Sequence, residues 1–534
     1  MEGNKYLYGA AVQGIQSFIF QTNKLREIVG ASELVEEICT LEFAKMLTGD
    51  NKLSYEEADK LLCNDPCAIR HAAGTVNYIF NDEEACRKVV RYFPKRISEF
   101  APGITISQAV ILLDENKPLS DATEKLAELL LSQRNKPMIS LSHGLIGLQR
   151  SRRTNMPVVH KEGEDFLDEA TVAKLNYLVE RSGRKITYIP RQTTYRLCQK
   201  AFGNIPIKKK EVAYNIEKMI DKNKWIAVIH IDGNGMGQVV RKVGTNPERF
   251  KLFSEELNKA TVQSAITAFN AVCGQFGDSE AIPIRPVVLG GDDHTLICRG
   301  DLAIDYVKNF MQAFEQQTRK YLANILNDKD RKVFTKGNKT DCLTACAGIA
   351  FVKFAYPFYY AYDLAEQLCE AAKKDAKNDP QIKAGEKLAD SCLMFHKVQD
   401  SFNEDYTDVV KRELMPNSHT SFKYGPYYLE EHGNNWTIDN LLKKVGILNG
   451  DEGNCIKSSL RRWMSTLYVD SEKAKQMLSR IINLEKSRSS IVKSITQGRQ
   501  LEKDIIAYPT YDMLALHTIN SQITRNTDKN ENKL

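Results

Sequence analysis

The chain is 534 residues long, with 42% hydrophobic and 27% charged residues and a formal net charge of +6. This ordinary globular composition excludes a mainly disordered chain, and the length is sufficient for two to four domains with cores of their own. The sequence holds no run of eighteen apolar residues and begins without a signal pattern, so we predict a cytoplasmic protein with no membrane span and no export.

Twelve cysteines are spread through the chain, most of them singly in apolar stretches, which is typical of buried thiols in a reducing compartment. Cys342 and Cys346 lie in one strand-like run, where four residues at about 3.3 Å each place them about 13 Å apart, too far for one zinc ion. Cys63 and Cys67, with His71 nearby, could provide half of a zinc site, but no partner pair follows at the usual spacing. Zinc at this pair stays an alternative to two unliganded thiols.

The first elements along the chain form one unit of strands and helices. We predict strands at 5–13, 75–80 and 103–113, and helices at 14–47 and 82–100. Residues 115–222 form a mixed region, which includes a predicted helix at 164–180, and we treat this region as an insertion or extension of the first unit.

The stretch from Trp225 has a more complete pattern. A strand ends at Asp232, a glycine-rich turn (GNGMGQ) follows, and a long amphipathic helix begins near Pro247. The next predicted elements are two strands joined by GGDD, a helix, a strand and a helix, at 284–290, 294–298, 302–326, 343–352 and 359–377. Strand, helix, strand, strand, helix, strand is the split βαβ, ferredoxin-like order, which palm domains of polymerases and cyclases share.

These patterns predict an α+β protein with two ferredoxin-like (βαββαβ) palm domains and a C-terminal helical domain. The expected boundaries are 1–222 for a degenerate first palm with its inserted region, 223–400 for a catalytic GGDD palm, 401–521 for the helical domain and 522–534 for a disordered tail. Where the second unit has GGDD, the first has AAGTVN, and its first strand leads into Gln13 in place of an aspartate. Chemistry is therefore expected only in the second unit.

Three aspartates are the candidate catalytic and metal-binding groups. Asp232 ends the first strand of the second unit, and Asp292 and Asp293 form the tip of the hairpin expected beside it. Because neighbouring strands lie about 4.8 Å apart, the three carboxylates can converge on one small volume, where Mg²⁺ or Mn²⁺ would offset their repulsion. The set fits two-metal phosphoryl transfer from a nucleotide. The structural alternative is an ordinary turn, because aspartate often hydrogen-bonds its own backbone there.

Residues around these aspartates are the candidates for nucleotide binding. Glycines let the backbone approach a substrate closely, and a lysine at a helix end can hold a phosphate or simply interact with the helix dipole. The predicted nucleotide-binding residues are Gly233, Asn234, Gly235, Gly290, Gly291 and Lys374. His230 and His294 flank the aspartates but alternate with apolar neighbours along strands, so we interpret both as packed structural groups.

Several stretches resemble a known family. HIDGNGMGQ, VVLGGDDHTLIC and TACAGIAFVKFAYPFYYAYDLAEQLCEAAKKDAK are similar to the second palm of the large polymerase/cyclase subunit of type III CRISPR effector complexes, in its Cmr-type form. YLYGAAVQGIQSFIFQTNKLREIVGASELVEE resembles the first, inactive palm of that subunit, and YGPYYLEE with the helices after it resembles the passage into its C-terminal domain. The resemblance extends over nearly the whole chain.

The resemblance implies a nucleotidyltransferase of antiviral defence that condenses ATP into cyclic oligoadenylates when its complex of effector subunits and guide RNA has bound a target RNA. Asp232 then matches the family's first metal-binding aspartate, and Asp292 and Asp293 match its GGDD pair. Many members have an aspartate followed by asparagine where this chain has Asn234 and Gly235, so one carboxylate is missing. Many also begin with an HD nuclease domain, but no His-Asp dipeptide occurs here, so DNA cleavage is not expected.

Three other functions stay open at this point. The first is a stand-alone relative that joins nucleotides into another signal molecule. The second, from a different class, is a non-catalytic scaffold subunit of an RNA-guided complex, whose acidic tip would bind only a structural ion. The third is a template-copying polymerase. Basic clusters at 207–211 and 371–377 are typical of solvated helix faces, but together such clusters leave room for an RNA partner.

Overall fold

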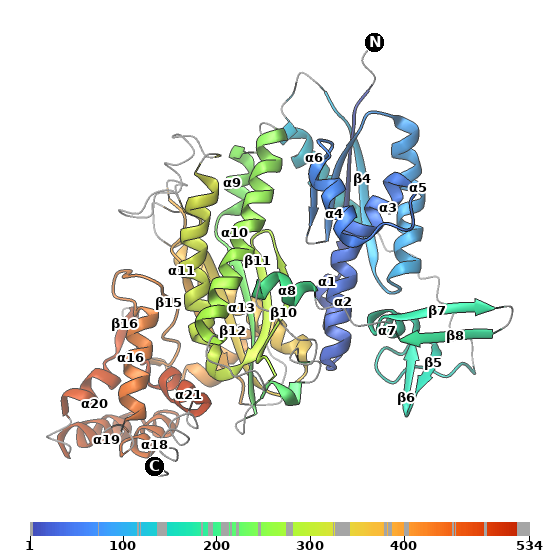
Figure 1. Ribbon diagram of the computed structural model, residues 1–534. Coiled ribbons are helices and arrows are strands. Elements are labelled where there is room, and N and C mark those ends of the chain that lie inside the picture. Colours follow the sequence, from blue (N-terminus) through green and yellow to red (C-terminus); the bar gives the residue numbers. More distant parts are fainter. Residues whose placement is uncertain are drawn as a thin grey trace, which may run out of the picture.

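The computed structural model has a mixed α+β fold, in which two units built on larger sheets lie side by side and a helical region follows the second of them (Figure 1). The predicted α+β class is confirmed. The structure describes residues 4–72, 74–114, 117, 119–135, 147–182, 185–190, 196–203, 213, 216–220, 224–243, 247–273, 281–323, 325, 342–378, 382, 387–399, 405–450, 453, 455–484, 489–502 and 504–520.

The first unit contains a four-stranded antiparallel sheet in the order β2-β3-β1-β4. Its strands are β1 (Tyr6–Gln13), β2 (Ala68–Ala72), β3 (Thr75–Phe80) and β4 (Thr105–Leu112). Its helices are α1 (Ile15–Ile19), α2 (Leu25–Glu37), the π-helix η1 (Ile38–Glu42), α3 (Phe43–Thr48), α4 (Tyr55–Asn64) and α5 (Glu83–Phe100). The three predicted strands are present, and β2 is an additional one.

The single helix predicted at 14–47 is wrong, because a non-helical segment separates α1 from α2. Asn23 lies in this segment, and its Oδ1 accepts a hydrogen bond from the Phe358 backbone N of the second unit at 3.0 Å. The non-helical segment between α1 and α2 therefore makes a contact between the two units. Helix α4 is absent from the sequence prediction, although Ser54 and Glu57 form a capping box at its start, which is a local signal for a helix N-terminus.

The inserted region contains two hairpins, so the helix predicted at 164–180 is also wrong. Its elements are α6 (Leu119–Arg134), β5 (Val158–Glu162), β6 (Asp165–Asp168), α7 (Glu169–Lys174), β7 (Tyr177–Ser182), β8 (Lys185–Pro190), α8 (Arg196–Phe202) and the 3-10 helix η2 (Ile216–Lys218). Only α7 is helical within 164–180. Asp168 caps its start by accepting a hydrogen bond from Thr171 N at 3.0 Å, and Asn176, at a φ of 59°, turns the chain away after its end.

The second unit contains a six-stranded sheet in the order β10-β11-β9-β12-β13-β15. Its strands are β9 (Trp225–Gly233), β10 (Ile284–Gly290), β11 (Asp293–Arg299), β12 (Ala345–Lys353), β13 (Cys392–Lys397) and β15 (Tyr427–Tyr428). Its helices are α9 (Met236–Val243), α10 (Pro247–Cys273), the 3-10 helix η3 (Gly300–Leu302), α11 (Ala303–Leu322) and α13 (Phe358–Ala376). Strands β10, β11, β9 and β12 occupy the same relative places as β2, β3, β1 and β4 of the first sheet.

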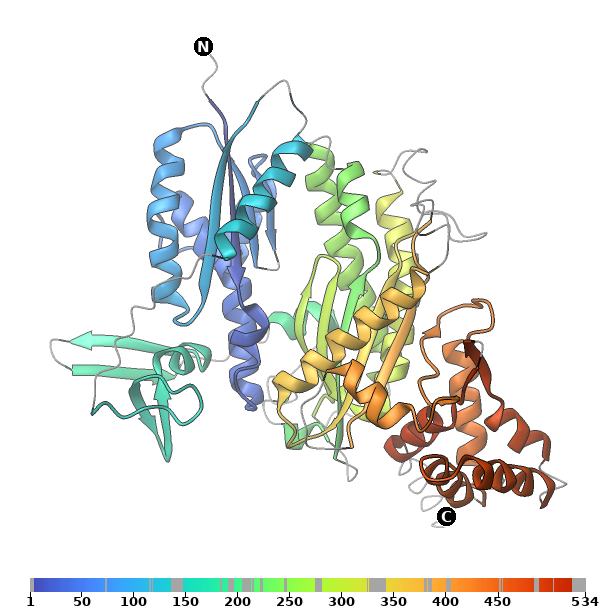
Figure 2. The ribbon, with the colours of Figure 1, turned by 180° about the vertical axis from the view of Figure 1, so that it is seen from behind.

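Alternation along β9 assigns its two faces to different cores. Ile229 and Ile231 pack into the core that includes α10 and α11, whereas Ile226 and Val228 pack into the core shared with the first unit and the start of α13. Figures 1 and 2 show α10 and α11 on one side of the sheet and α13 across the other. Since side chains alternate with a period of two, Asp232 lies on the α13 face.

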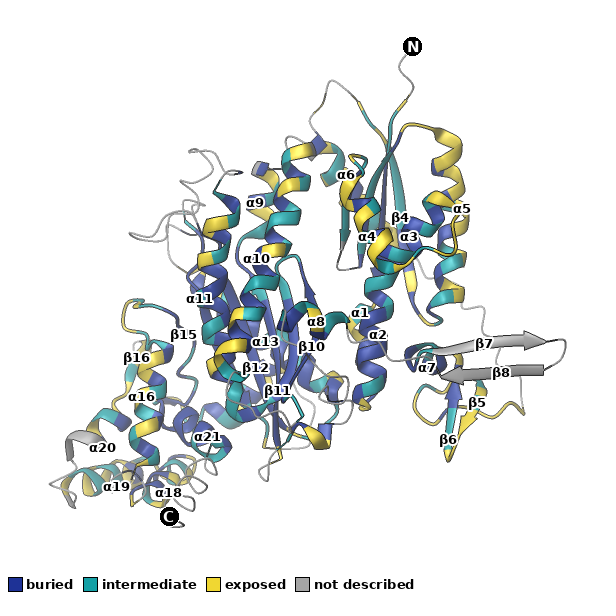
Figure 3. Ribbon diagram, viewed as in Figure 1, coloured by how far each residue is buried: buried dark blue, intermediate teal, exposed yellow. Residues whose placement is uncertain are grey.

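The first unit packs against the second through β2, which contacts α10, and through the segment of α1 and α2. The Phe20 ring stacks on the Tyr362 ring with centroids 4.7 Å apart, and Ser32 Oγ of α2 donates a hydrogen bond to Val287 O of β10. Figure 3 shows that most of α2 is buried. The two sheets are therefore joined by a packed helical layer.

The C-terminal region is mainly helical, as predicted, and it also contains a small sheet in the order β14-β17-β16. Its elements are α15 (Tyr406–Val409), the π-helix η5 (Val410–Leu414), β14 (Thr420–Ser421), α16 (Ile438–Asn449), α18 (Lys457–Leu467), α19 (Ser471–Leu484), α20 (Ser489–Thr496), β16 (Arg499–Glu502), β17 (Ile505–Ala507) and α21 (Thr510–Asn520). The tail predicted at 522–534 lies outside the described residues, and the domain boundaries stay predictions. Across the described ranges, the helices lack the length and apolarity needed to cross a bilayer.

Candidate active site at the acidic hairpin

The three predicted aspartates meet at one end of the second sheet. Asp293, the first residue of β11, is the direct antiparallel partner of Asp232 near the end of β9. Asp292 occupies the turn between β10 and β11, and its backbone O accepts a hydrogen bond from Gly233 N at 3.2 Å. The pairing register thus brings all three carboxyl groups to the same sheet edge, as the sequence predicts.

Helix α10 holds the turn that carries the acidic pair. Gly291 has a φ of +64°, which an L side chain rarely adopts, so glycine suits this position. Thr261 Oγ1 donates a hydrogen bond to Gly291 O at 2.5 Å, and Asn258 Oδ1 accepts one from Gly291 N at 3.4 Å. On the facing strand, a Cβ on Gly233 would lie only 2.9 Å from the Asp292 Cβ. Glycine at these two positions therefore permits the close approach of strand and turn.

The crowded carboxyl groups resist ionisation. Burial, followed by the charge of Asp232, raises the pKa of Asp292 and that of Asp293 to about 7. The Asp293 side chain as a whole keeps 36% exposure, but its Oδ1 is shielded from solvent and accepts no hydrogen bond within the described part of the chain. This oxygen has the His230 Nδ1 3.5 Å away as its neighbour. Such a site favours an added cation.

Lys373 of α13 is the cation that contacts this cluster. Its Nζ donates hydrogen bonds to Asp232 Oδ2 at 2.5 Å and to Gly233 O at 2.9 Å. Burial alone would lower the pKa of Lys373, but the charge and hydrogen bond of Asp232 outweigh it and raise that pKa. Lys374, the lysine predicted to bind nucleotide, is exposed. The neighbouring Lys373 is the one that reaches the aspartates, and phosphate binding by Lys374 stays a prediction.

One face of α13 covers the site, and most of its residues are not among the predicted site residues. Tyr362, Glu366 and Lys373 follow at helical spacing on one face of the helix. Burial raises the pKa of Glu366, whose charge also acts on Asp293. The sequence shows that these residues share one face of a helix. Only the fold shows that this face lies on the sheet beside the aspartates.

The two flanking histidines are buried, in agreement with their interpretation as packed groups. His294 contacts Val288 O through Nδ1 at 3.0 Å and Tyr306 Oη through Nε2 at 2.8 Å, and burial lowers its pKa to about 4. His230 contacts Thr295 Oγ1 at 3.1 Å through Nδ1 and lies at the edge of the carboxylate cluster. Burial lowers the pKa of His230 as well.

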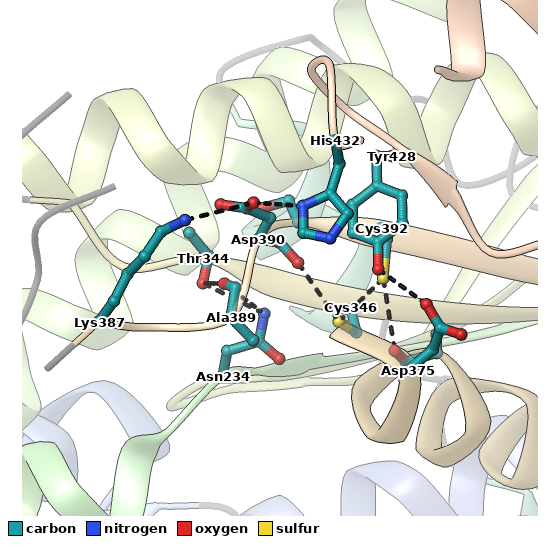
Figure 4. Close-up of polar contacts among 12 residues, drawn as sticks. Asn234, Thr344, Cys346, Asp375, Lys387, Ala389, Asp390, Cys392, Tyr428 and His432 are labelled. Atoms are coloured by element: carbon teal, nitrogen blue, oxygen red, sulfur yellow. Dashed lines mark hydrogen bonds and ion pairs between the residues drawn. The ribbon is translucent and has the colours of Figure 1, made fainter. Parts of the chain in front are cut away.

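Asn234 lies behind the site and not in it. Its side chain is fully buried, and Nδ2 donates hydrogen bonds to Thr344 Oγ1 at 3.1 Å and to Ala389 O at 3.3 Å (Figure 4). Its backbone N donates to Thr344 O at 2.8 Å. These contacts tie the turn after β9 to the residue before β12 and to the segment before β13, and nucleotide binding by Asn234 stays a prediction.

The segment before β13 makes further polar contacts behind the site. Asp390 Oδ2 contacts His432 Nδ1 at 2.8 Å and Lys387 Nζ at 3.7 Å, as Figure 4 shows. Leu388 of the same segment limits the turn after β9, since a Cβ on Gly235 would lie 2.6 Å from its Cδ2, and Gly235 has a φ of +67°. Gly235 therefore has a structural reason to be glycine besides its predicted contact with nucleotide.

A cavity of about 1040 Å³ opens from the acidic turn toward the first unit. Gly290, Gly291, Asp292 and Asp293 line one end of it. Residues of α1, α2, η1, α4, β2, α8, α9, α10, β10 and α13 line the remainder, including the basic residues Lys60, Arg70, Arg196, Lys200, Lys251 and Lys259. The same part of the lining also includes the acidic residues Glu33, Glu36, Glu56, Asp59 and Glu255. Volumes up to about 1,000 Å³ are usual for small-molecule pockets. The site is thus a cleft between the two units with an acidic end and walls of mixed charge.

The donor set fits divalent magnesium or manganese. Three carboxyl groups converge at the acidic end, two of them resist ionisation, and Asp293 Oδ1 is a shielded acceptor that takes no hydrogen bond from the described residues. Hard divalent cations prefer carboxylate oxygens, and a bound cation would relieve the repulsion among these groups. Asp232, Asp292 and Asp293 are therefore the residues able to hold such an ion.

The fold and the site define a palm-type sheet with an acidic GGDD hairpin. Residues 225–380 match the family model described as Cas10/Cmr2, second palm domain. This match confirms the resemblance to the large palm-domain subunit of type III CRISPR complexes, and it covers the unit that holds the three aspartates. A search of curated protein sequences finds no match.

Solved structures similar to this chain are Csm1-Csm4 assemblies. The Csm1-Csm4 subcomplex of the type III-A CRISPR-Csm interference complex aligns over 97% of this chain and 70% of its own, with 14% identity and a TM-score of 0.51. The Csm1-Csm4 cassette in complex with AMPPNP aligns over the same shares, with 13% identity and a TM-score of 0.50. The cassette in complex with cA4 aligns over 71% of this chain, with 14% identity and a TM-score of 0.45. This chain spans only 54% of that last structure's length.

Proposed function

We propose that this chain is a Mg²⁺-dependent nucleotidyltransferase that condenses ATP into a cyclic oligoadenylate-like second messenger in antiviral defence. The observation that carries the proposal is the convergence of Asp232 with Asp292 and Asp293, the last two of which line one end of a cavity between the two units. The match of this unit to the Cas10/Cmr2 second palm supports the same activity. Solved Csm1-Csm4 cassettes in complex with AMPPNP and with cA3 have the same overall fold.

The residues of the site have separate roles in this proposal. Asp232, Asp292 and Asp293 would hold Mg²⁺ or Mn²⁺, which supplies activation of the attacking hydroxyl and neutralisation of the departing pyrophosphate. Lys373 offsets part of the carboxylate charge before substrate arrives. The backbone at Gly290 and Gly291 is open to a nucleotide in the cavity, and basic side chains of the same cavity could contact its phosphates.

The proposal includes the setting in which the chain works. The two sheets have the same relative strand order, which supports two ferredoxin-like palms, the first of them without acidic residues at its hairpin. Similarity to Csm1 within Csm1-Csm4 assemblies supports other CRISPR effector subunits as partners. Guide and target RNA would be the activating partners, consistent with the basic clusters of the sequence.

A turnover assay tests the proposal. Purified protein, alone and with its effector subunits and target RNA, is incubated with ATP and MgCl₂; pyrophosphate release is followed and the product is identified by mass spectrometry. We expect the double variant Asp292→Asn/Asp293→Asn to lose turnover by at least about 100-fold, because these side chains hold the metal. The matched control Asp408→Asn changes an exposed aspartate of α15 and should keep full turnover.

Two results would contradict the proposal. Turnover that survives in the double variant would remove the acidic hairpin from the mechanism. The complete absence of turnover in every combination of partner, RNA and nucleotide, together with RNA-dependent assembly that the double variant retains, would favour the scaffold function. A linear or mixed product would keep the nucleotidyltransferase assignment and replace the cyclic product.

A further inference from the structure

A second group of potential metal ligands lies in the first unit, away from the acidic hairpin. Asp59 and Cys63 are four residues apart on α4, so they share one face of that helix. His71 reaches the same point from β2, where an irregular pairing between Ala68 and Arg70 shifts the register of the strand against β3. Residues from a helix and from a neighbouring strand thus converge on one location.

The three ligand atoms form a compact triangle. Cys63 Sγ lies 3.7 Å from His71 Nε2 and 4.0 Å from Asp59 Oδ1, and His71 Nε2 lies 3.6 Å from Asp59 Oδ1. A tetrahedral zinc ion, with bonds of about 2.3 Å to sulfur and about 2.0–2.1 Å to nitrogen and oxygen, would place its ligands about 3.3–3.6 Å apart. Each side of the triangle therefore needs to shorten by only a few tenths of an ångström.

The geometry disfavours a nucleophilic cysteine activated by histidine. In such a triad the nucleophile and the orienting carboxylate contact opposite nitrogens of the imidazole ring. Here Cys63 Sγ and Asp59 Oδ1 both approach the same nitrogen, Nε2 of His71. Convergence of three donors on one side of the ring is the arrangement that a bound cation requires. The combination of thiolate, imidazole and carboxylate selects Zn²⁺ over Mg²⁺.

Cys67 does not take part, so the pair considered from the sequence is corrected. Within the described residues, the cluster contains three ligand groups, and Cys67 is not one of them. The Asp65 carboxylate lies beside Cys67, where Oδ1 accepts a hydrogen bond from the Cys67 backbone N at 2.8 Å. Asp59, Cys63 and His71 all line the cavity that reaches Asp292 and Asp293, so a fourth ligand can arrive from that cavity.

We infer that Asp59, Cys63 and His71 bind one Zn²⁺ ion whose fourth coordination position opens into the cavity between the two units. Three protein ligands and one exchangeable position are the arrangement of zinc sites that bind a water molecule or a substrate group. The fourth ligand would be water or an anionic group of a molecule in the cavity. The ion also joins α4 to β2, two elements that form one wall of that cavity. This inference does not depend on the proposed nucleotidyl transfer.

Metal binding by the full chain tests the site. Metal-stripped protein is titrated with ZnCl₂ in the presence of excess MgCl₂, and bound zinc is measured by mass spectrometry after gel filtration. We expect one Zn²⁺ per chain in the wild type and its loss in Cys63→Ser and in His71→Gln. Cys67→Ser is the matched control and should retain the ion. The double variant Asp292→Asn/Asp293→Asn should also retain it, which separates this site from the acidic hairpin.

Cobalt substitution gives a readout that does not depend on stability. Co²⁺ in the wild type should produce the visible bands of a tetrahedral ion and a near-ultraviolet band from the thiolate, and Cys63→Ser should lose the latter. Sodium azide should shift the visible bands, because the fourth position is open to small anions. Asp59→Asn provides a third ligand variant in case His71→Gln fails to fold.

Three outcomes would overturn the inference. Zinc uptake that Cys63→Ser leaves unchanged would place the metal elsewhere, and loss of zinc in Cys67→Ser would replace this ligand set. The absence of zinc uptake at micromolar concentrations would reduce the cluster to an ion pair between protonated His71 and Asp59. Cobalt bands insensitive to azide would contradict the open fourth position.

Discussion

Replacement of Lys373 by methionine removes the cation that contacts the acidic cluster while it keeps most of the apolar stem. In the wild type, Lys373 Nζ lies 2.5 Å from Asp232 Oδ2 and 2.9 Å from Gly233 O. The lysine side chain is 16% exposed and that of Asp232 is 39% exposed. The pair is thus partly shielded from water, and its loss leaves three carboxyl groups without their ammonium partner.

The loss of unfolding free energy expected for Lys373→Met lies between two limits. Removal of one partner from a fully buried ion pair costs about 3–5 kcal/mol, whereas exposed pairs contribute about 0–1 kcal/mol. Because Asp232 remains well hydrated, we expect Lys373→Met to lower the free energy of unfolding of the second unit by about 2 kcal/mol. For a unit of this size, that loss corresponds to a decrease in melting temperature of about 4–8 °C. Mg²⁺ should recover part of it, since a divalent cation can replace the lost ammonium group.

Thermal unfolding followed by circular dichroism provides the assay, first with excess chelator and then with millimolar MgCl₂. Lys374→Met is the matched control, because it alters the exposed neighbouring lysine by the same change. The control should melt like the wild type in both conditions. Equal melting temperatures for Lys373→Met and the wild type with chelator would refute the reasoning. So would a rise with Mg²⁺ that is no larger in Lys373→Met than in the wild type.

Three further predictions concern the support of the site and one buried acid. Asn234→Asp should lower the free energy of unfolding by about 2–4 kcal/mol, because its carboxylate would be buried against the Ala389 carbonyl oxygen. Calorimetry should detect no gain in Mg²⁺ affinity, and tighter Mg²⁺ binding would contradict the buried orientation of this side chain. Gly235→Ala should cost about 1–3 kcal/mol in urea unfolding because of its positive φ and the close Leu388, whereas Gly237→Ala, with no atom within 4 Å of the added Cβ, should be near neutral. An equal cost for both would argue against strain at the turn. Burial raises the pKa of Asp512 from 3.8 to about 7, so the folded state holds a proton that the unfolded state has released. Stability should therefore fall as the pH rises from about 4 to about 7, by at most about 4 kcal/mol, and chemical denaturation of Asp512→Asn should lack this fall. A variant with the wild-type slope would place the titration elsewhere.

The acidic site could be predicted from the sequence because it depends on short stretches of adjacent residues. Asp232 ends an apolar run, and the GGDD hairpin lies between two short apolar strands, so period and turn chemistry are enough to place the three aspartates at one sheet edge. The structure confirms the pairing of Asp232 with Asp293. The same reasoning failed at 164–180, where apolar spacing suited a helix but Asp168 and Asn176 limit it to six residues.

Only the tertiary structure shows which of two adjacent residues contacts the acidic site. Lys373 and Lys374 are equivalent by position in the sequence, but successive residues of a helix point about 100° apart, and only the face of α13 that lies on the sheet reaches Asp232. Asn234 follows the strand that carries Asp232, and only its contacts with Thr344 and Ala389, far along the chain, direct its side chain away from the cavity.

The sequence by itself determined the α+β class, the acidic hairpin and the strand that accompanies it, since these depend on local periodicity and on turn residues. The tertiary structure decided which cations and ligands meet. Lys373 contacts Asp232 across the sheet face, and His71 joins Asp59 and Cys63 where β2 lies beside α4. Such contacts depend on the packing of elements far apart in the sequence, and the free energy of that packing comes from the burial of apolar surface over the whole fold. The spacing of residues within a short stretch of sequence does not predict this packing.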